Sequence, residues 1–484
     1  MVSVKKNYLY QVLYEISSII IPLITAPYVT RVLGASNLGV FSYTQSIANL
    51  FLSLARLGIV NHGSRSIAAV QNDRYLRSKI FSRIYCVQFI FASLVTIMYV
   101  SYAIFFIENN TTIALIQTIW VSVAIFDIAW VFGGIENFKL TVIRGITIKL
   151  VTLILLFVIV RNENDLWKYT LIMTGGMLLG NLILWKSWHK YFDFIKPKIN
   201  EVLLEIKPLI ILFIPTIAVT IYTTMDKIML GSISGEIYTA YYEYSSKLVA
   251  IPMGFITSFG LVMLPRMSAM SANGIDYSKQ QQTITNSLIF VMFLSSAFSF
   301  GLAAISDVLI PLYYGSAFLS CVLLMKIIAI KLPAMAWANV IRTQILIPQH
   351  KNKLYIFSLF VGASVNLVLN FILIKNYKDI GVAIATVLSE ITVCLIQSFF
   401  IEDKKVLIKP FMVSVLFILN GLIMYCVVTL FSNVIPLKGV LLLVLEVLIG
   451  ATYYFCASLL IISKFILRKS ICQTINIFKK NLIH

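Results

Sequence analysis

Apolar side chains along this chain form long runs separated by short polar stretches. Most runs are close to the roughly 20 residues that a helix needs to cross a bilayer. We count fourteen, at residues 9–30, 40–58, 84–106, 113–132, 143–160, 167–188, 209–230, 244–264, 285–305, 319–347, 354–374, 381–400, 411–431 and 440–462. The run 319–347 is too long for one straight span and contains Pro333, which predicts a kink or tilt. The pattern predicts an all-α, polytopic membrane protein with about fourteen transmembrane helices.

Composition supports this interpretation. Hydrophobic residues make up 59% of the chain and charged residues 12%, against about 45–50% and about 25% in soluble domains. A soluble enzyme is therefore excluded. The formal net charge of +19 indicates cytoplasmic loops rather than a nucleic-acid partner in so apolar a protein.

The lysines and arginines are distributed unevenly between the two sets of loops. With an even number of spans, both termini lie on one side of the membrane. The termini and the even-numbered loops hold 25 cations, and the other loops hold only Arg31, Arg161, Lys375, Lys378 and Lys438. By the positive-inside rule, both termini are cytoplasmic. The basic start is followed by an apolar run without a cleavage site, so we interpret it as the first span.

The first and seventh spans share an order of features. Each has proline within the span, Leu-Gly near its outer end and a tyrosine ten or eleven residues later, as in Pro22, Pro27, Leu33-Gly34 and Tyr43 against Pro215, Leu230-Gly231 and Tyr241. Such a repeat predicts two six-helix lobes related by a pseudo-two-fold axis, with a cavity between them. We expect an N-lobe at 1–190, a cytoplasmic linker at 191–208, a C-lobe at 209–400, and two further spans with a tail at 401–484.

Motifs for enzymatic or metal chemistry are missing from the sequence. The six cysteines form no C-x-x-C pair, five of them lie within apolar runs, and the four histidines are far apart. No nucleophile elbow, P-loop or zinc-protease motif occurs. The sequence therefore predicts a protein that is not an enzyme and has neither a metal nor another cofactor. Without a nucleotide site, a proton or sodium gradient is the candidate driving force.

Several cations lie within spans, where a charge costs at least ~2.5–3.5 kcal/mol near the bilayer centre. Such residues usually face a cavity, so we predict that the cavity is cationic. For Arg56, snorkelling to the interface is an alternative, and for Lys247 a surface ion pair with Glu243 is another. The candidates for binding an anionic substrate are Arg56, Lys149, Lys247, Lys326, Lys331 and Arg342.

Three embedded carboxylates, Asp127, Asp226 and Glu390, are candidates for ion coupling. Each could instead be a permanently ionised partner of a cation, and the sequence does not choose between these roles. Embedded cations outnumber embedded carboxylates. A cavity with this bias would attract an anion such as a diphosphate and disfavour a cationic drug.

Three stretches resemble polysaccharide flippases of the Wzx type, in the multidrug, oligosaccharidyl-lipid and polysaccharide exporter superfamily. The first runs from Pro27 to Gly39 and continues into Phe41-Ser42-Tyr43; the second is Leu312-Tyr313-Tyr314-Gly315 with Phe318; the third joins Asn366–Asn370 to Gly381–Glu390. With the span count, they extend the resemblance over essentially the whole chain.

The resemblance implies a flippase that moves undecaprenyl-diphosphate-linked oligosaccharide units to the outer leaflet of the bacterial inner membrane, for O-antigen, capsule or similar polymers. Membrane lipids, and the polymerase and chain-length proteins of the same pathway, are candidate partners. Related flippases use arginines on the first, second and eighth spans. Their nearest counterparts are Arg31, Arg56 and Lys247, although Arg31 ends its span and position eight is lysine.

Two other functions compete with this interpretation. A cation-coupled multidrug exporter of the same superfamily should have twelve spans and an acidic cavity. A polysaccharide polymerase or ligase should have a long extracytoplasmic loop for its chemistry. The predicted span count, the cationic bias and the short loops favour the flippase over both.

Overall fold

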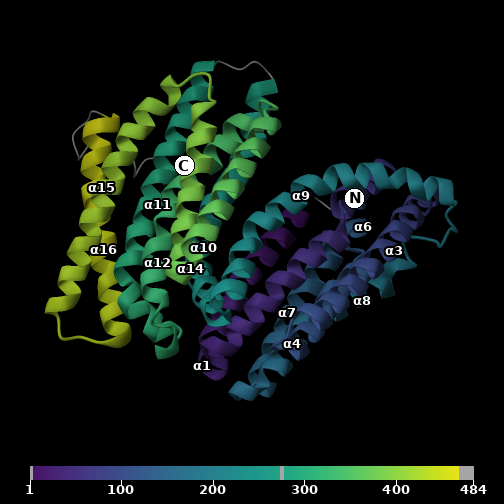
Figure 1. The fold of residues 1–484 in the computed structure, drawn as a ribbon. Helices are drawn as coiled ribbons and strands as arrows, with labels where there is room; N and C mark the ends of the chain where they lie inside the picture. The colour runs from purple at the N-terminus through teal and green to yellow at the C-terminus, as the bar shows by residue number, and fades with distance from the viewer. Residues whose placement is uncertain (1–3, 273–276, 468–484) are drawn as a thin grey trace. The chain divides into compact units, whose positions relative to one another are not determined.

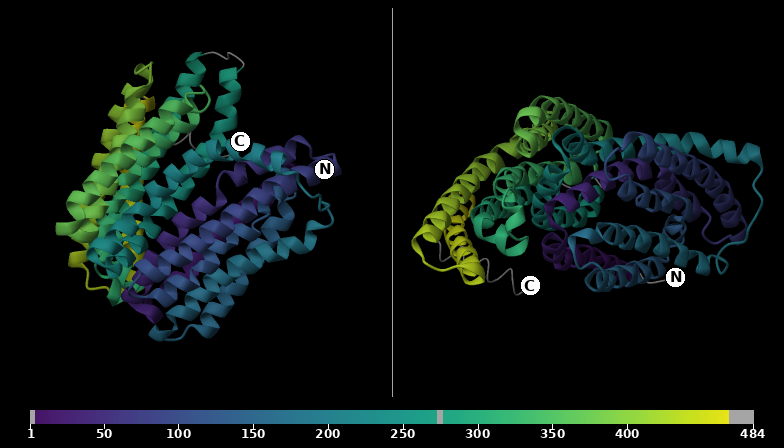
Figure 2. Two further views of the ribbon diagram at one scale, coloured as in Figure 1. Left: turned by 45° about the vertical axis from the view of Figure 1, so that its right-hand side comes forward. Right: turned by 60° about the horizontal axis from the view of Figure 1, so that its bottom comes forward.

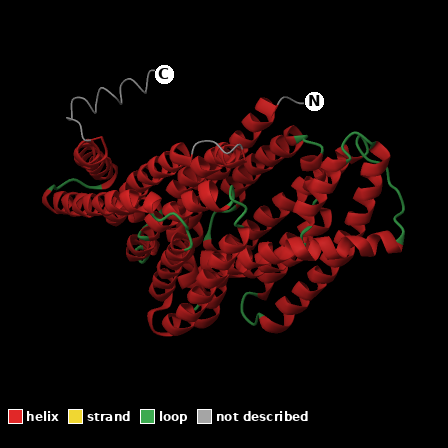
Figure 3. Ribbon diagram, turned by 90° about the horizontal axis from the view of Figure 1, so that it is seen from above, coloured by secondary structure: helices red, strands yellow, loops and turns green. Residues whose placement is uncertain are grey.

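The computed structural model describes residues 4–272 and 277–467, and this part of the chain is helical without any strand (Figure 3). Two compact units, Met1–Ala240 and Tyr241–His484, divide the chain. The helices of the first unit are α1 (Val4–Arg56), α2 (Ile59–Ala69), α3 (Arg74–Phe106), α4 (Thr111–Ile116), α5 (Thr118–Phe126), α6 (Ala129–Gly134), α7 (Phe138–Ile159), α8 (Leu166–Trp188) and α9 (Ile199–Ser234) (Figure 1).

The second unit contains most of α10 (Glu236–Ala272) and all later helices. These are α11 (Tyr277–Tyr313), α12 (Cys321–Ala329), α13 (Lys331–Ile341) with a π-helical turn at Arg342–Leu346, α14 (Asn352–Phe399), α15 (Lys405–Val434) and α16 (Gly439–Ile461). Helices α15 and α16 run side by side, and α15 packs along α11 (Figures 1 and 2).

Most of the predicted spans correspond to separate helices. Ten helices of the described residues are long and apolar enough to cross a membrane, or eleven if α9, which bends by 60° between Ile214 and Val219, is one span. Helices α1 and α14 each contain a break, at Gly34 and Lys378, so each supplies two of the predicted spans. Helix α8 covers the sixth predicted run. The prediction of an all-α polytopic membrane protein is confirmed.

The predicted interruption of the run 319–347 is also present. Helix α12 ends at Ala329 and α13 begins at Lys331, with Pro333 in the first turn of α13. Proline is tolerated in a first turn because the N–H that it lacks would have no partner within the helix there. A turn at Ile330 therefore separates α12 from α13 just before Pro333.

Two glycines near the aligned segments have a positive φ. Gly34 has φ 72° and ψ 173°, and Gly235 has φ 109° and ψ 156°; both lie in the left-handed region, which favours glycine. Gly231, the counterpart expected from the Leu-Gly motif, instead packs against Tyr43, whose ring would lie 2.2 Å from a Cβ at this position. Of the two aligned glycines, only Gly34 has a positive φ, and the repeat stays a prediction.

The boundary between the two compact units lies at a different position in the sequence from the predicted boundary between the lobes. The lobe boundary was expected in the linker 191–208, whereas the units divide between Ala240 and Tyr241. The reason is that α9 packs along α1 and also contacts α2 and α3. The lobe assignment itself stays a prediction, and residues 468–484 of the predicted tail lie outside the described part of the chain.

Candidate functional site

A break between α5 and α6 places a carboxylate inside the first unit. Asp127 follows the end of α5 with extended backbone angles, and it is only 8% exposed. Its Oδ1 accepts a hydrogen bond from the backbone N–H of Ala129 at 3.1 Å, at the start of α6. Aspartate competes in this way for backbone donors at helix ends. The polar residue in an apolar run thus follows one helix and accepts a hydrogen bond from the first residue of the next.

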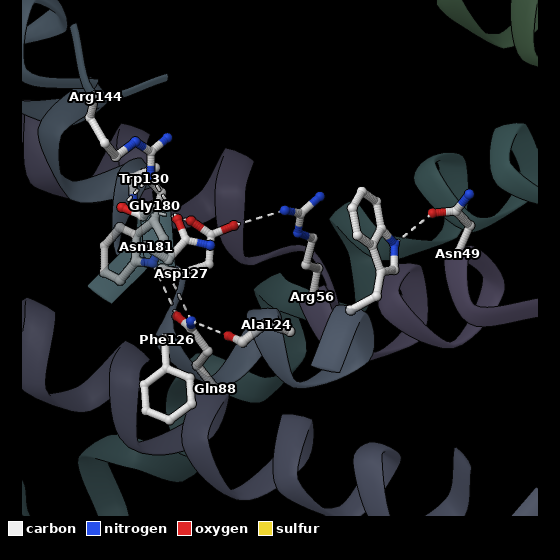
Figure 4. Close-up of polar contacts among 12 residues, drawn as sticks. Asn49, Arg56, Gln88, Ala124, Phe126, Asp127, Trp130, Arg144, Gly180 and Asn181 are labelled. Atoms are coloured by element: carbon white, nitrogen blue, oxygen red, sulfur yellow. Dashed lines mark hydrogen bonds and ion pairs between the residues drawn. The ribbon is translucent and has the colours of Figure 1, made fainter. Parts of the chain in front are cut away.

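Arg56, the last residue of α1, is the ion-pair partner of this carboxylate. Its Nη2 donates to Oδ2 of Asp127 at 2.9 Å (Figure 4). The side chain of Arg56 is 33% exposed, and its Nε has no hydrogen-bond partner among the described residues. The structure thus joins a predicted substrate-binding cation to a predicted ion-coupling carboxylate. Arg56 still has donor capacity for a further ligand.

Gln88 of α3 stabilises the break between α5 and α6 by hydrogen bonds. Its Nε2 donates to the backbone oxygens of Ala124 at 2.6 Å and Asp127 at 2.8 Å. Its Oε1 accepts from Nε1 of Trp130 at 3.0 Å (Figure 4). Carbonyl groups freed by a helix break need such partners at membrane depth. Sequence reasoning missed Gln88, although an amide inside the apolar run 84–106 was the available signal.

Arg144 belongs to α7. Its Nη1 donates to Oδ1 of Asn181 at 2.8 Å and to the backbone oxygen of Gly180 at 3.3 Å, both on α8. In Figure 4 Arg56 and Arg144 flank Asp127, and Arg144 interacts with this carboxylate electrostatically. The local charge around Asp127 is therefore positive.

Arg56 also lines a cavity of about 470 Å³ within the first unit. We call it the threonine cavity; its walls are Asn49, Leu52, Ser53, Arg56, Leu57, Gly58, Val60, Asn61, Thr216, Thr220, Thr223 and Thr224. The hydroxyls of Ser53 on α1 and Thr220 on α9 lie 2.9 Å apart across it. One cation and a set of hydroxyl and amide groups therefore line the same cavity.

The threonine hydroxyls of this cavity are available to a ligand mainly as hydrogen-bond acceptors. The hydroxyls of Thr216, Thr220, Thr223 and Thr224 each donate to the carbonyl oxygen four residues earlier in α9. A hydroxyl whose hydrogen is used in this way keeps lone pairs for a ligand donor. Arg56 supplies only donors. The cavity can thus bind a ligand that combines an anion with hydroxyl groups.

The other predicted cations of the first unit lie elsewhere. Arg31 is exposed on α1, and its Nη1 donates to the backbone oxygen of Pro27 at 2.9 Å. Lys149 of α7 donates to the hydroxyl of Ser18 and lies 4.0 Å from the centre of the Tyr14 ring. Neither residue lines the threonine cavity.

In the second unit, two predicted cations form exposed ion pairs. Lys326 pairs with Asp307 at 2.6 Å, and Lys247 pairs with Glu243 at 3.2 Å. The Lys247 side chain is 46% exposed, so the surface ion pair considered as its alternative role is present. A substrate role for either lysine stays a prediction.

Lys331 and Arg342 lie at the two ends of α13. Lys331 is its partly exposed first residue, and Arg342 follows it, with its guanidinium carbon 5.7 Å from the centre of the Tyr355 ring. Of the remaining coupling candidates, Asp226 is buried in α9 and Glu390 is half-buried in α14. The roles of these residues stay predictions.

These features define a polytopic membrane transporter. The model of a family described as polysaccharide biosynthesis protein matches residues 4–271, more than half of the chain. The chain belongs to this family, as the resemblance predicted.

A curated relative and two solved structures extend the comparison. The chain is 23% identical over 414 residues to a candidate O-antigen transporter of Escherichia coli (strain K12), covering 84% of this chain and 98% of that protein. It shares its fold with the lipid II flippase MurJ in an inward closed conformation, at a TM-score of 0.74 and 18% identity over 94% of this chain and 100% of that chain.

The second solved structure is an inward-facing multidrug transporter of the MATE family. It gives a TM-score of 0.61 at 11% identity over 79% of this chain and 92% of that chain. The fold is therefore shared by carriers of very different substrates. The relatives are transporters, which bears out the prediction that the chain is not an enzyme.

Proposed function

We propose that this protein is a flippase that moves undecaprenyl-diphosphate-linked oligosaccharide units from the cytoplasmic to the outer leaflet of a bacterial inner membrane, by alternating access through a cationic central cavity. The observation that carries the proposal is the lining of the threonine cavity, where Arg56 lies among hydroxyl and amide groups. The candidate O-antigen transporter from E. coli supports the same class of cargo.

The chemistry of the cavity suits this cargo. A diphosphate offers only acceptors, and a guanidinium binds it with charge-assisted hydrogen bonds. Sugar hydroxyls offer donors, which the threonine oxygens of α9 can accept. Asp127 orients Arg56 through the 2.9 Å ion pair. In this role Asp127 positions the cation and does not itself contact the cargo.

A cation-coupled multidrug exporter is the alternative, since the fold is shared with such a protein. The threonine cavity does not favour it. Its single lining charge is a guanidinium, and the carboxylate nearest to it is already paired. A cationic drug would find no unpaired anion there.

Vesicles containing the purified protein and a lipid-linked oligosaccharide test the proposal. We expect the headgroup to exchange between leaflets, and we expect a cationic dye not to be transported. Arg56→Ala should remove the exchange, whereas Arg74→Ala, which breaks an exposed ion pair with Asp193, should not. Dye transport without lipid exchange would contradict the flippase and favour the exporter.

The proposal includes cytoplasmic termini and a gradient as the source of energy. A cysteine at Asn72, in a Cys-free background, should be inaccessible to a reagent applied outside intact cells, because its loop belongs to the cation-rich set. Labelling from outside would overturn this topology. An imposed proton or sodium gradient across the vesicles should accelerate exchange, and equal rates with and without a gradient would contradict ion coupling.

A further inference from the structure

A long apolar groove lies on the second unit, far along the chain from the threonine cavity. Its volume is about 720 Å³, and it is bounded by parts of α11, α13, α14 and α15. We call it the α14–α15 groove. Its edges carry large apolar side chains that are mostly exposed, such as Leu395 at 63%, Phe399 at 68% and Phe411 at 63%. Nothing proposed for the cargo uses this groove.

One end of the groove is cationic. Lys404 lines it at the start of α15, and its Nζ lies 4.8 Å from the centre of the ring of Phe399, which also lines the groove. Among the described residues, Lys404 has no ion-pair partner. The two neighbouring carboxylates are engaged elsewhere, because Glu402 pairs with Lys351 at 2.7 Å and Asp403 accepts from Gln281. The Lys351 ammonium lowers the pKa of Glu402, which keeps that carboxylate ionised and paired.

The length of the groove fits one leaflet of a bilayer. Along α15 it extends from Lys404 to Ile418, which is about 21 Å at about 1.5 Å per residue. Half of a bilayer is about 20–22 Å thick including its headgroups. A groove of this length has room for one acyl chain, with the headgroup beside Lys404. The polar hydroxyls along it, such as that of Ser398, are already hydrogen-bonded within the protein.

We propose that the α14–α15 groove binds the acyl chain of an anionic phospholipid, with its phosphate at Lys404. The lysine end follows Phe399 in one of the cation-rich loops; in the topology proposed above, on which this step rests, that loop lies at the cytoplasmic leaflet, where anionic lipids attract basic residues. The occupant is a lipid of the surrounding bilayer and not the transported cargo.

A photoreactive lipid tests this site directly. The full-length protein is reconstituted in phosphatidylcholine vesicles with a small amount of phosphatidylglycerol that carries a diazirine in its acyl chain. After illumination, the labelled peptides are mapped by mass spectrometry. We expect the label to concentrate on residues 391–418, and phosphatidylcholine with the same diazirine to label this region several times less.

Two variants and two matched controls isolate the groove. Lys404→Gln should lower labelling of residues 391–418 about fivefold, as expected for one lysine near an anionic headgroup; Lys353→Gln, at the start of α14, removes a cation outside the groove and should not. Ala334→Trp should fill the groove and remove the label. Ala451→Trp, on the exposed surface of α16, should leave the label in place.

Three outcomes would overturn the proposal. They are labelling spread evenly over the lipid-exposed helices, equal labelling by both phospholipids, and labelling that neither groove variant changes. Displacement of the photoreactive phosphatidylglycerol by a polyprenyl diphosphate would also contradict it, because the groove would then hold the chain of the cargo. None of these results depends on transport activity.

Discussion

The threonine cavity of the first unit and the α14–α15 groove of the second differ in the groups that surround the cation of each site. In the cavity, Arg56 is paired with a buried carboxylate and surrounded by hydroxyl groups. In the groove, Lys404 stands at the end of an apolar surface without an ion-pair partner among the described residues. A cation fixed among polar groups suits a hydroxylated anion, whereas a cation beside apolar side chains suits an anionic lipid. The same charge thus supports two kinds of ligand.

Replacing Arg56 should give the largest effect on transport. We expect Arg56→Ala to lower polymer export at least about tenfold, because charge-assisted hydrogen bonds contribute about 1.5–3 kcal/mol. Export is measured by complementation in cells that lack the native flippase, at matched membrane levels of protein. Lys404→Gln is the comparison variant and should retain export. If the two variants lose export equally, the distinction between the two sites fails.

Removing the partner of Arg56 should affect stability as well as transport. Asp127→Asn leaves the guanidinium without a counter-charge. The cost of breaking a buried pair, about 3–5 kcal/mol, should be reduced here because Arg56 is one-third exposed. We therefore expect a clear fall in Tm of the detergent-solubilised protein.

The gradient response separates the two roles open to Asp127. If wild type and Asp127→Asn respond equally to a proton or sodium gradient in vesicles, Asp127 is a structural partner rather than a coupling residue. The same assay with Glu390→Gln examines the candidate in the second unit. Loss of the response in either variant, with exchange still measurable, would identify a coupling site.

Gln88 should stabilise the break between α5 and α6, where Asp127 lies, without contacting the cargo. Gln88→Leu leaves the carbonyls of Ala124 and Asp127 and the indole N–H of Trp130 without this partner. Unsatisfied buried groups cost about 1–3 kcal/mol, so the Tm should fall while residual transport keeps its gradient response. Phe89→Leu, at an exposed neighbouring position, is the control and should leave the Tm unchanged. A normal Tm for Gln88→Leu would show that the break is held by other contacts.

The cations at the two ends of α13 should have an intermediate effect. Lys331→Ala and Arg342→Ala remove embedded cations, so we expect normal insertion and export reduced severalfold. The alternative is a structural pair with Glu390. Full activity in a charge-swapped double variant, such as Lys331→Glu with Glu390→Lys, would show a structural pair and contradict the substrate role.

The spans were predictable because they depend on local properties. Apolar runs and the proline in 319–347 act within one helix, and the helices follow them. The pair of Arg56 and Asp127 was not predictable, since 71 positions separate the two residues and only tertiary packing joins them. The conformations of the glycines were not predictable either: Leu-Gly occurs in many helices, and the left-handed backbone at Gly34 and Gly235 is visible only in the structure.

Lys247 should show the smallest effect. Its pair with Glu243 spans one helical turn and is half-exposed, and such pairs contribute about 0.3–0.5 kcal/mol. Lys247→Ala should therefore leave the Tm within error of wild type. Because Glu243 already neutralises the lysine, we also expect export to fall no more than about twofold, well short of Arg56→Ala. Glu243→Gln is the informative companion, since it removes this ion pair while keeping the lysine, and it should leave export unchanged or raised. If Lys247→Ala abolished export as Arg56→Ala should, the cation of the eighth span would also bind cargo, and the substrate site would extend beyond the first unit.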